Sequence, residues 1–447
     1  MAARRSFNRA RNVPVNVKVE NARLLAFEVI CDVLDKGAYS NLLLPQRLSK
    51  TSLEPRDRAF ATELVYGTLR LQGRLDHYLS QLSHRPLSEL DFQLLVVLRL
   101  GIFQLNELSM PAHAAVNETT ELAKRVVGKS SASFVNAILR EVGRSALELP
   151  TEASMEAIAI RTSHPEWIVR ALSESIADPM RIENLLHSHN RPTHPTLNAL
   201  PGRCTAEELL AMGALKIESS ENAFEFKGNP GEIPAVREHR AIVQDLGSQI
   251  VVEQFHRVSL SRGKGTTLRW LDACAGPGGK AAYLDALIPE EELVANEISA
   301  PRSKLVANVV RRARVTTSDA RFIKDSLGEF DRILIDAPCT GLGALRRRPE
   351  VRWRRTPADL ASLQNLQREI LNSAVAALNP GGIIGYSTCS PHLAETSLQI
   401  RRFLAEHKNF RRIELSSSHT NKDGDLQLWT DRDGTDSMFL SLLERVS

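Results

Sequence analysis

From residue 244 onward, short apolar runs alternate with helical stretches, and this alternation constrains the fold more than any other feature. The segments that we expect to be strands lie at residues 268–273, 292–296, 315–317, 332–335 and 383–386. Strands that alternate with helices are typical of a parallel sheet covered by helices. We therefore predict a C-terminal α/β Rossmann-like domain over residues 244–447. Its strand order should be 3-2-1-4-5, with a closing antiparallel hairpin from residues 426–429 and 438–443.

The residues before this domain divide into three parts. Residues 1–16 contain four arginines and no acid, which is typical of a disordered basic tail. Residues 17–148 carry helical periodicity, such as Ala61, Val65 and Leu69, and predict an all-α bundle of six or seven helices. Residues 149–243 are rich in proline with short mixed patterns, and we expect a small α+β connecting domain there.

Composition excludes several classes of protein. The net charge is only +4, so any nucleic-acid surface must come from local clusters of basic residues. The most apolar stretch, residues 94–103, is interrupted by Arg99 and is too short to cross a membrane. Five cysteines at wide spacings, without a Cys-x-x-Cys pair, argue against zinc and against a disulfide framework. We expect a soluble cytoplasmic monomer that binds no metal.

A glycine-rich turn follows the first strand of the α/β domain. The residues of this cofactor loop are Cys274, Ala275, Gly276, Pro277, Gly278, Gly279 and Lys280. Glycines let a ligand approach the backbone, and the start of a helix offers free N–H groups to a carboxylate. The spacing fits the amino acid end of S-adenosylmethionine and not a dinucleotide or a P-loop phosphate. The alternative is an ordinary strand-to-helix turn.

Two acids follow the next two strands. Glu297 ends the second strand, where a carboxylate can hold ribose hydroxyls, and Asp319 follows the third, where it can meet adenine. Either acid alone is more often a helix cap or a solvated residue, but the pair at consecutive strand ends favours a nucleoside site.

Cysteines follow the fourth and fifth strands. Asp336-Ala337-Pro338-Cys339-Thr340-Gly341 is the Pro-Cys loop, and Tyr386-Ser387-Thr388-Cys389-Ser390 is the Thr-Cys loop. Neighbouring parallel strands bring both loops to one rim of the sheet. A thiolate that adds to C6 of cytosine makes C5 nucleophilic enough to accept a methyl group, and Asp336 is the candidate acid near N3 and N4. The residues themselves do not rank the two thiols.

These motifs resemble those of the RsmB/NOP family of bacterial 16S ribosomal RNA cytosine-C5 methyltransferases, also called Fmu or Sun, from Asn21 onward. The resemblance rests on the cofactor loop, the two cysteine loops, residues 345–355, Arg56-Asp57-Arg58-Ala59-Phe60 and His164-Pro165-Glu166-Trp167. It implies that the C-terminal domain is a class I methyltransferase domain and that the N-terminal domain resembles the RNA-binding antitermination factor NusB. It also implies that Cys389 is the nucleophile, that Cys339 assists product release, and that the cofactor loop, Glu297, Asp319 and Asp336 bind S-adenosylmethionine.

A cluster of six arginines follows the Pro-Cys loop. We expect phosphate contacts to ribosomal RNA, with a single-stranded or flipped-out cytosine as the target, from Arg346, Arg347, Arg348, Arg352, Arg354 and Arg355. Two alternatives remain open: a DNA cytosine methyltransferase, and a non-catalytic RNA-binding scaffold on a degenerate methyltransferase fold.

Overall fold

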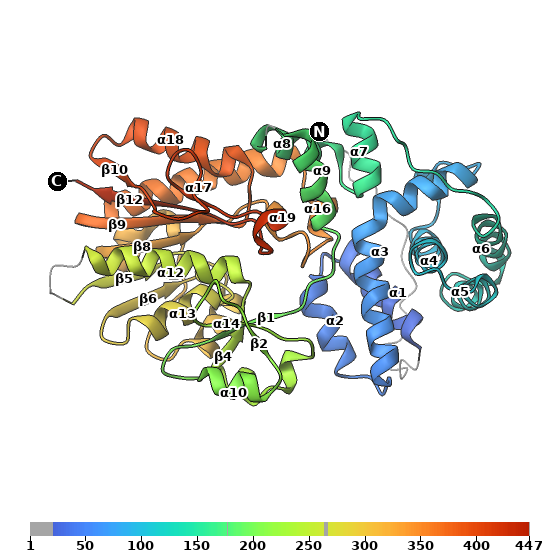
Figure 1. Ribbon diagram of the computed structural model, residues 1–447, viewed down its shortest axis with the longest axis horizontal. Coiled ribbons are helices and arrows are strands. Elements are labelled where there is room, and N and C mark those ends of the chain that lie inside the picture. Colours follow the sequence, from blue (N-terminus) through green and yellow to red (C-terminus); the bar gives the residue numbers. More distant parts are fainter. Residues whose placement is uncertain (1–20, 177, 263–266, 447) are drawn as a thin grey trace. The chain divides into compact units, whose positions relative to one another are not determined.

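The computed structural model of the protein describes residues 21–176, 178–262 and 267–446. The chain divides into two compact units, residues 1–148 and 149–447, whose elements are labelled in Figure 1. The predicted basic tail at residues 1–16 lies outside the described residues.

Over residues 21–148, the described part of the first unit, the secondary structure is all helical, as the apolar periodicity predicts. Ala61, Val65 and Leu69 are fully buried on its longest helix, and Asp91 caps another helix by accepting a hydrogen bond from the Gln93 N–H. Its helices are α1 (Ala22–Asp35), α2 (Ser40–Leu48), α3 (Pro55–Leu82), α4 (Phe92–Ile102), α5 (Ala112–Val126) and α6 (Lys129–Val142), with short turns η1 (Leu87–Glu89) and η2 (Phe103–Glu107).

The second unit begins with three helices and a small sheet. The four strands pair antiparallel in the order β2-β3-β1-β4, and Leu197, Leu209 and Phe224 belong to their own apolar core. The predicted α+β segment therefore has both a helical and a β part. Its elements are α7 (Met155–Thr162), α8 (Glu166–Ser175), α9 (Pro179–Ser188), β1 (Thr196–Ala199), α10 (Ala206–Ala211), β2 (Leu215–Lys216), β3 (Ala223–Glu225), η3 (Pro230–Glu232), α11 (Pro234–Arg237) and β4 (Ala241–Val243).

The rest of the second unit is built on a larger mixed sheet. Its strands lie in the order β10-β12-β9-β8-β5-β6-β7, with β11 paired to β12. The elements are α12 (Leu246–Ser261), β5 (Arg269–Asp272), α13 (Gly279–Leu287), β6 (Glu292–Asn296), α14 (Ala300–Val309), β7 (Arg314–Thr316), η4 (Ala320–Phe322), α15 (Ile323–Leu327), β8 (Phe330–Asp336), η5 (Leu342–Ala344), α16 (Val351–Arg354), α17 (Pro357–Ala377), β9 (Leu378–Thr388), η6 (Leu393–Glu395), α18 (Ser397–Glu406), β10 (Phe410–Ile413), β11 (Leu426–Gln427), α19 (Thr430–Asp433) and β12 (Phe439–Arg445).

The five parallel strands have the predicted order 3-2-1-4-5, because β7, β6, β5, β8 and β9 are neighbours. The predicted closing hairpin is also present, since β11 pairs antiparallel with β12. β12 also continues the sheet by pairing antiparallel with β9. β10, which pairs with the other edge of β12, has no counterpart among the predicted strands.

Both faces of this sheet are covered by helices (Figure 1). Alternate strand residues point to opposite faces. Trp270 and Leu334 therefore join a core with α12 and α13, whereas Leu271 and Ile333 join a second core with α17 and α18. This double burial explains why the strands read as continuous apolar runs. It also leaves the carboxyl ends of the strands as the exposed place where polar loops can gather.

Candidate active site

The cofactor loop connects β5 to α13 through close contacts that only glycine permits. Gly278 has a φ of +117°, and a Cβ there would lie 2.5 Å from Val309 Cγ2. A Cβ on Gly276 would lie 2.2 Å from the Glu297 carboxylate. Glycine is therefore required at both positions, because a side chain would collide with α14 or with the end of β6.

Glu297 and Asp319 follow β6 and β7, as predicted. The Glu297 carboxylate is 2% exposed and accepts hydrogen bonds from the backbone N–H groups of Gly276 at 3.1 Å and Ser299 at 3.0 Å. Asp319 caps η4 by accepting from the Arg321 N–H, and its hydrogen bonds with the Arg321 side chain lower its pKa. Glu297 thus holds the cofactor loop in shape, while Asp319 forms the cap that was the alternative for an isolated acid.

Asp272, at the end of β5, was not among the predicted site residues. It is fully buried, and among the described residues neither carboxylate oxygen has a hydrogen-bond partner of good geometry. Burial, together with the nearby Asp336 carboxylate, raises its pKa to about 7. Buried carboxylates normally have partners, so this orphaned acid marks a place for a positively charged or hydrogen-bond-donating ligand.

The Pro-Cys and Thr-Cys loops meet at the carboxyl ends of β8 and β9. Asp336 and Ser387 are direct neighbours in the parallel register, and each cysteine follows its strand within three residues. The two sulfur atoms, Cys339 Sγ and Cys389 Sγ, are 3.4 Å apart, and both side chains are partly exposed. The structure therefore brings the two predicted catalytic thiols into direct contact.

The surroundings of these thiols differ in charge. The hydrogen bond from Cys339 lowers the pKa of Cys389 to about 7, against the effect of burial and with the help of the Arg348 and Lys280 cations. The pKa of Cys339 is raised by that same hydrogen bond, by burial, and by the Glu395 and Asp336 carboxylates. Cys389 is consequently the better thiolate, with Cys339 as its hydrogen-bond donor.

Lys280 connects the cofactor loop to the Pro-Cys loop. Its side chain is 9% exposed, and its ammonium lies 2.8 Å from Asp336 Oδ2 and 3.1 Å from Ser248 Oγ. Burial would lower the pKa of Lys280, but the Asp336 carboxylate raises it. The ion pair places the Asp336 side chain beside the thiols. Cys274 is a neutral thiol in the same loop, because burial and the Asp272 carboxylate raise its pKa.

Glu395 stabilises the Pro-Cys loop through hydrogen bonds, and it was not among the predicted site residues. It is fully buried and accepts hydrogen bonds from the Thr340 N–H at 2.8 Å and the Gln367 side chain at 3.1 Å. The Thr340 hydroxyl donates to its second oxygen at 2.5 Å. Since the Gln367 amide also donates to the Pro338 carbonyl, a buried network fixes the two residues that flank Cys339.

The six arginines that were predicted to bind RNA fall into a buried group of two and a partly exposed group of four. Arg352 is fully buried and donates to the Ser163 carbonyl and the Asn190 side chain. Arg346 is 9% exposed and bonds to Asp245 and Asp436. These two guanidinium groups are buried and bonded to acceptors within the protein, which argues against the predicted phosphate contacts for both.

The other four arginines are partly exposed: Arg347, Arg348, Arg354 and Arg355. Arg347 pairs with Asp436, Arg355 donates to the Thr340 carbonyl, and Arg348 points toward the Cys389 sulfur. The segment is thus anchored at several points beside the thiols.

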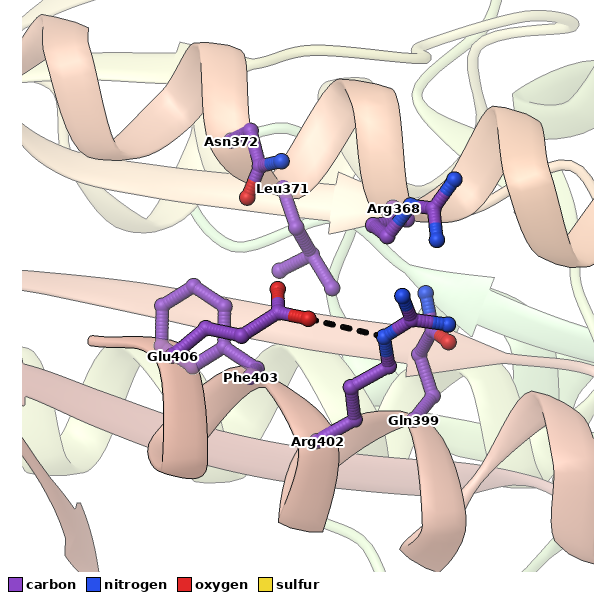
Figure 2. Close-up of a pocket in the computed structure, with 7 residues that line it drawn as sticks. All are labelled: Arg368, Leu371, Asn372, Gln399, Arg402, Phe403 and Glu406. Carbon is purple, nitrogen blue, oxygen red and sulfur yellow. Dashed lines mark hydrogen bonds and ion pairs between the residues drawn. The ribbon is translucent and has the colours of Figure 1, made fainter.

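A surface depression in the second unit, away from the thiols, is lined by none of the candidate site residues. Figure 2 shows it between α17 and α18, where Arg402 and Glu406 form an ion pair at 2.9 Å beside Phe403. Within the described ranges, no group of three His, Cys, Asp or Glu side chains is arranged to hold a metal ion. In the same ranges, none of the helices has the length and apolar character of a membrane span.

The strand order of the large sheet and the glycine-rich loop after its first strand are those of a class I methyltransferase, and known proteins identify the family. The model of the NusB family matches residues 20–144, and the model described as 16S rRNA methyltransferase RsmB/F matches residues 260–444. The protein Rv1407 of Mycobacterium tuberculosis, named as a methyltransferase, is 40% identical over 96% of this chain and 97% of its own length. Ribosomal RNA small subunit methyltransferase B of Vibrio cholerae is 31% identical over 88% of this chain and 92% of its own.

The chain therefore belongs to the RsmB/F family of 16S ribosomal RNA methyltransferases. It is an S-adenosylmethionine-dependent enzyme that acts on ribosomal RNA, which confirms the predicted family, fold and cofactor. The family assignment favours RNA over the DNA alternative.

Solved structures agree on the fold. The crystal structure of PH0851 has a TM-score of 0.80 at 21% identity and covers 94% of this chain and 99% of its own. NSun6 from Pyrococcus horikoshii, solved with SFG, has a TM-score of 0.55 at 16% identity and covers 63% of this chain and 98% of its own.

Proposed function

We propose that the protein methylates C5 of a specific cytosine in 16S ribosomal RNA, with Cys389 as the covalent nucleophile and Cys339 as the residue that assists release. The observation that carries this proposal is the contact between two thiols at the ends of β8 and β9, one with a lowered pKa and the other with a raised pKa. Methyl transfer to oxygen or nitrogen requires no thiol, whereas C5 of cytosine is a poor nucleophile until a thiolate adds at C6.

The residues around the cofactor loop suit S-adenosylmethionine. When bound, this cofactor supplies an electrophilic methyl group. The loop around Gly276 and Gly278 leaves room for a ligand beside the first turn of α13, and the orphaned Asp272 carboxylate offers an acceptor for an ammonium group. Glu297 and Asp319 are the candidates for the ribose and adenine contacts, and Cys274 to Lys280 complete the lining.

The chemistry begins at Cys389. Its thiolate adds to C6 of the cytosine, and the electron pair of the C5–C6 double bond becomes available at C5 for the new bond to the methyl carbon. Asp336, held by Lys280 at 2.8 Å, lies beside the thiols as the candidate group for the N3 and N4 edge of the base. This edge must be polarised because addition at C6 places negative charge on the ring.

Release of the methylated RNA requires the covalent bond between Cys389 and C6 to break. A base takes the C5 proton, the C–H electron pair restores the C5–C6 double bond, and the C6–S bond breaks to return Cys389 as a thiolate. The Cys339 S–H, 3.4 Å away, stabilises this departing anion by donating a hydrogen bond to it. Its raised pKa keeps the proton in place for this role.

RNA contacts are assigned to surfaces outside the thiol pair. Partly exposed Arg347, Arg354 and Arg355 are the candidates for phosphate contacts near the site. We also assign RNA binding to the NusB-like domain at 17–148 and to the connecting domain at 149–243, with the methyltransferase domain at 244–447. A cytosine must leave its stack to reach thiols in this position.

A covalent trap tests the proposal. A 16S RNA fragment that contains 5-fluorocytosine should, with S-adenosylmethionine present, form a stable protein–RNA adduct, because fluorine cannot leave C5 as a proton does. Cys389→Ala should lose both the adduct and methylation of normal RNA, measured by gel shift and tritium transfer. Full activity of Cys389→Ala would contradict the proposed nucleophile.

A further inference from the structure

Arg348 stands apart from the other arginines of its segment. Its Nη2 lies 3.9 Å from Cys389 Sγ, and among the residues that the structure describes no carboxylate lies within ion-pair distance of its guanidinium. The backbone holds it in place, since the Arg348 N–H donates to the Ala344 carbonyl at 3.0 Å and the Val351 N–H donates to the Arg348 carbonyl at 3.1 Å.

We propose that Arg348 is the counter-cation of the nucleophile: it holds the Cys389 sulfur as a thiolate and orients it, in place of the phosphate contact expected from its sequence cluster. This inference rests on the proposed function of Cys389. It assigns to Arg348 a role in the covalent step. The neighbouring Arg346 and Arg352 do not have this role, because their side chains are buried and bonded to other parts of the protein.

The other charges around the sulfur are compensated. On α13, the Lys280 ammonium is paired with Asp336 at the end of β8. Arg347, which also acts on Cys389 electrostatically, is paired with Asp436 in the loop before β12. Cys339 contributes a hydrogen bond and no charge. Asp436 is within electrostatic range of Arg348, but its oxygens are bonded to Arg346 and Arg347. Arg348 is therefore the cation whose charge is left for the thiolate.

The Pro-Cys loop leaves space for this contact. Gly341 has a φ of +76°, and a Cβ there would lie 3.8 Å from Arg348 Nη2. The guanidinium thus lies close to Gly341 of the Pro-Cys loop while its Nη2 faces the sulfur of the Thr-Cys loop. An opposite charge at this distance typically shifts a pKa by about one to three units, which is enough to decide whether a thiol is ionised at neutral pH.

The test measures thiolate formation without RNA. The full-length protein is treated with iodoacetamide between pH 5.5 and 9.5, and alkylation of each cysteine is quantified by peptide mass spectrometry. Arg348→Gln should shift the midpoint for Cys389 upward by about one to two pH units, so that alkylation at pH 7 falls about tenfold. Arg348→Lys keeps the charge and should remain near the wild-type midpoint. Arg257→Gln, an exposed arginine on α12, is the matched control and should change nothing.

Two outcomes would overturn the inference. One is an unchanged Cys389 midpoint in Arg348→Gln with weakened RNA binding, which would make Arg348 a phosphate contact. The other is an equal upward shift in Arg348→Lys, which would show that shape and not charge matters. Arg348→Met, which keeps the alkyl stem, provides a second neutral variant should Arg348→Gln not fold. Activity of Cys389→Ala would defeat the proposed function but would leave this alkylation result standing, so the two failures are distinguishable.

Discussion

The Pro-Cys loop and the Thr-Cys loop occupy similar positions in the fold, but the pKa values of their thiols are shifted in opposite directions. Each follows a parallel strand of the same sheet, each presents a partly exposed thiol, and the two sulfurs are in contact. The charges that reach them come from different parts of the chain, however. Arg348 and Lys280 act on Cys389, whereas Glu395 acts on Cys339. The hydrogen bond between the two thiols favours one thiolate, and the charges outside both motifs favour Cys389 as that thiolate.

The largest effect should come from removing the second thiol. Cys339→Ala deprives the departing Cys389 thiolate of its hydrogen-bond donor, so we expect multiple-turnover methylation to fall about 10²-fold or more. A first round of methyl transfer should still occur, and protein covalently joined to normal RNA should accumulate as a slow band on a denaturing gel. Cys31→Ala, in the other unit, is the control. Free turnover of Cys339→Ala would show that the two loops are not specialised.

This division of labour could be predicted from sequence only in part. The strand order and the positions of Asp336, Cys339 and Cys389 followed from apolar runs and from the rule that parallel strands end at one edge. The ranking of the thiols followed only from the family resemblance. No local pattern marks the charges that distinguish them, because Glu395 lies 55 residues from Thr340 along the chain.

Arg352 shows the same limit of prediction from sequence, here for a residue that was predicted to bind RNA and is buried. A run of arginines after a catalytic loop predicts a phosphate-binding surface, and composition cannot tell which members turn inward. Arg352 does so because Ser163 and Asn190, 189 and 162 residues away, supply acceptors for it. Arg346 does so because Asp245 and Asp436 neutralise it. Partners at such separations are determined by tertiary packing, which periodicity does not encode.

With saturating S-adenosylmethionine at every pH, the pH dependence of the covalent step should report the ionisation of Cys389. Its pKa is lowered to about 7, so the reactive thiolate is present above pH 7 and is lost as the pH falls. Because the pKa of Cys339 is raised, that thiol stays protonated in this range. Adduct formation with 5-fluorocytosine RNA, followed by rapid quench, should therefore fall about tenfold from pH 8 to pH 6. A midpoint above pH 8.5, the ordinary range of a thiol, would remove the proposed difference between the loops.

The smallest effect should come from Glu395→Gln, which changes the charge behind Cys339 and nearly keeps the shape. The substitution weakens the charge-assisted bonds to the Thr340 N–H and hydroxyl, so we expect a loss of about 1–3 kcal/mol in the free energy of unfolding. It also removes one cause of the raised pKa of Cys339. Alkylation of Cys339 at pH 8 should then increase a few-fold, and turnover should decrease by a similar factor.

Glu406→Gln on α18 is the matched control, because it removes an exposed carboxylate that pairs with nearby Arg402 and should leave the free energy of unfolding nearly unchanged. A lower stability of Glu395→Gln without any change in Cys339 alkylation would confine Glu395 to support of the loop. The raised pKa of Cys339 would then depend on burial and on the hydrogen bond to Cys389, and the difference between the two thiols would reside on the Cys389 side.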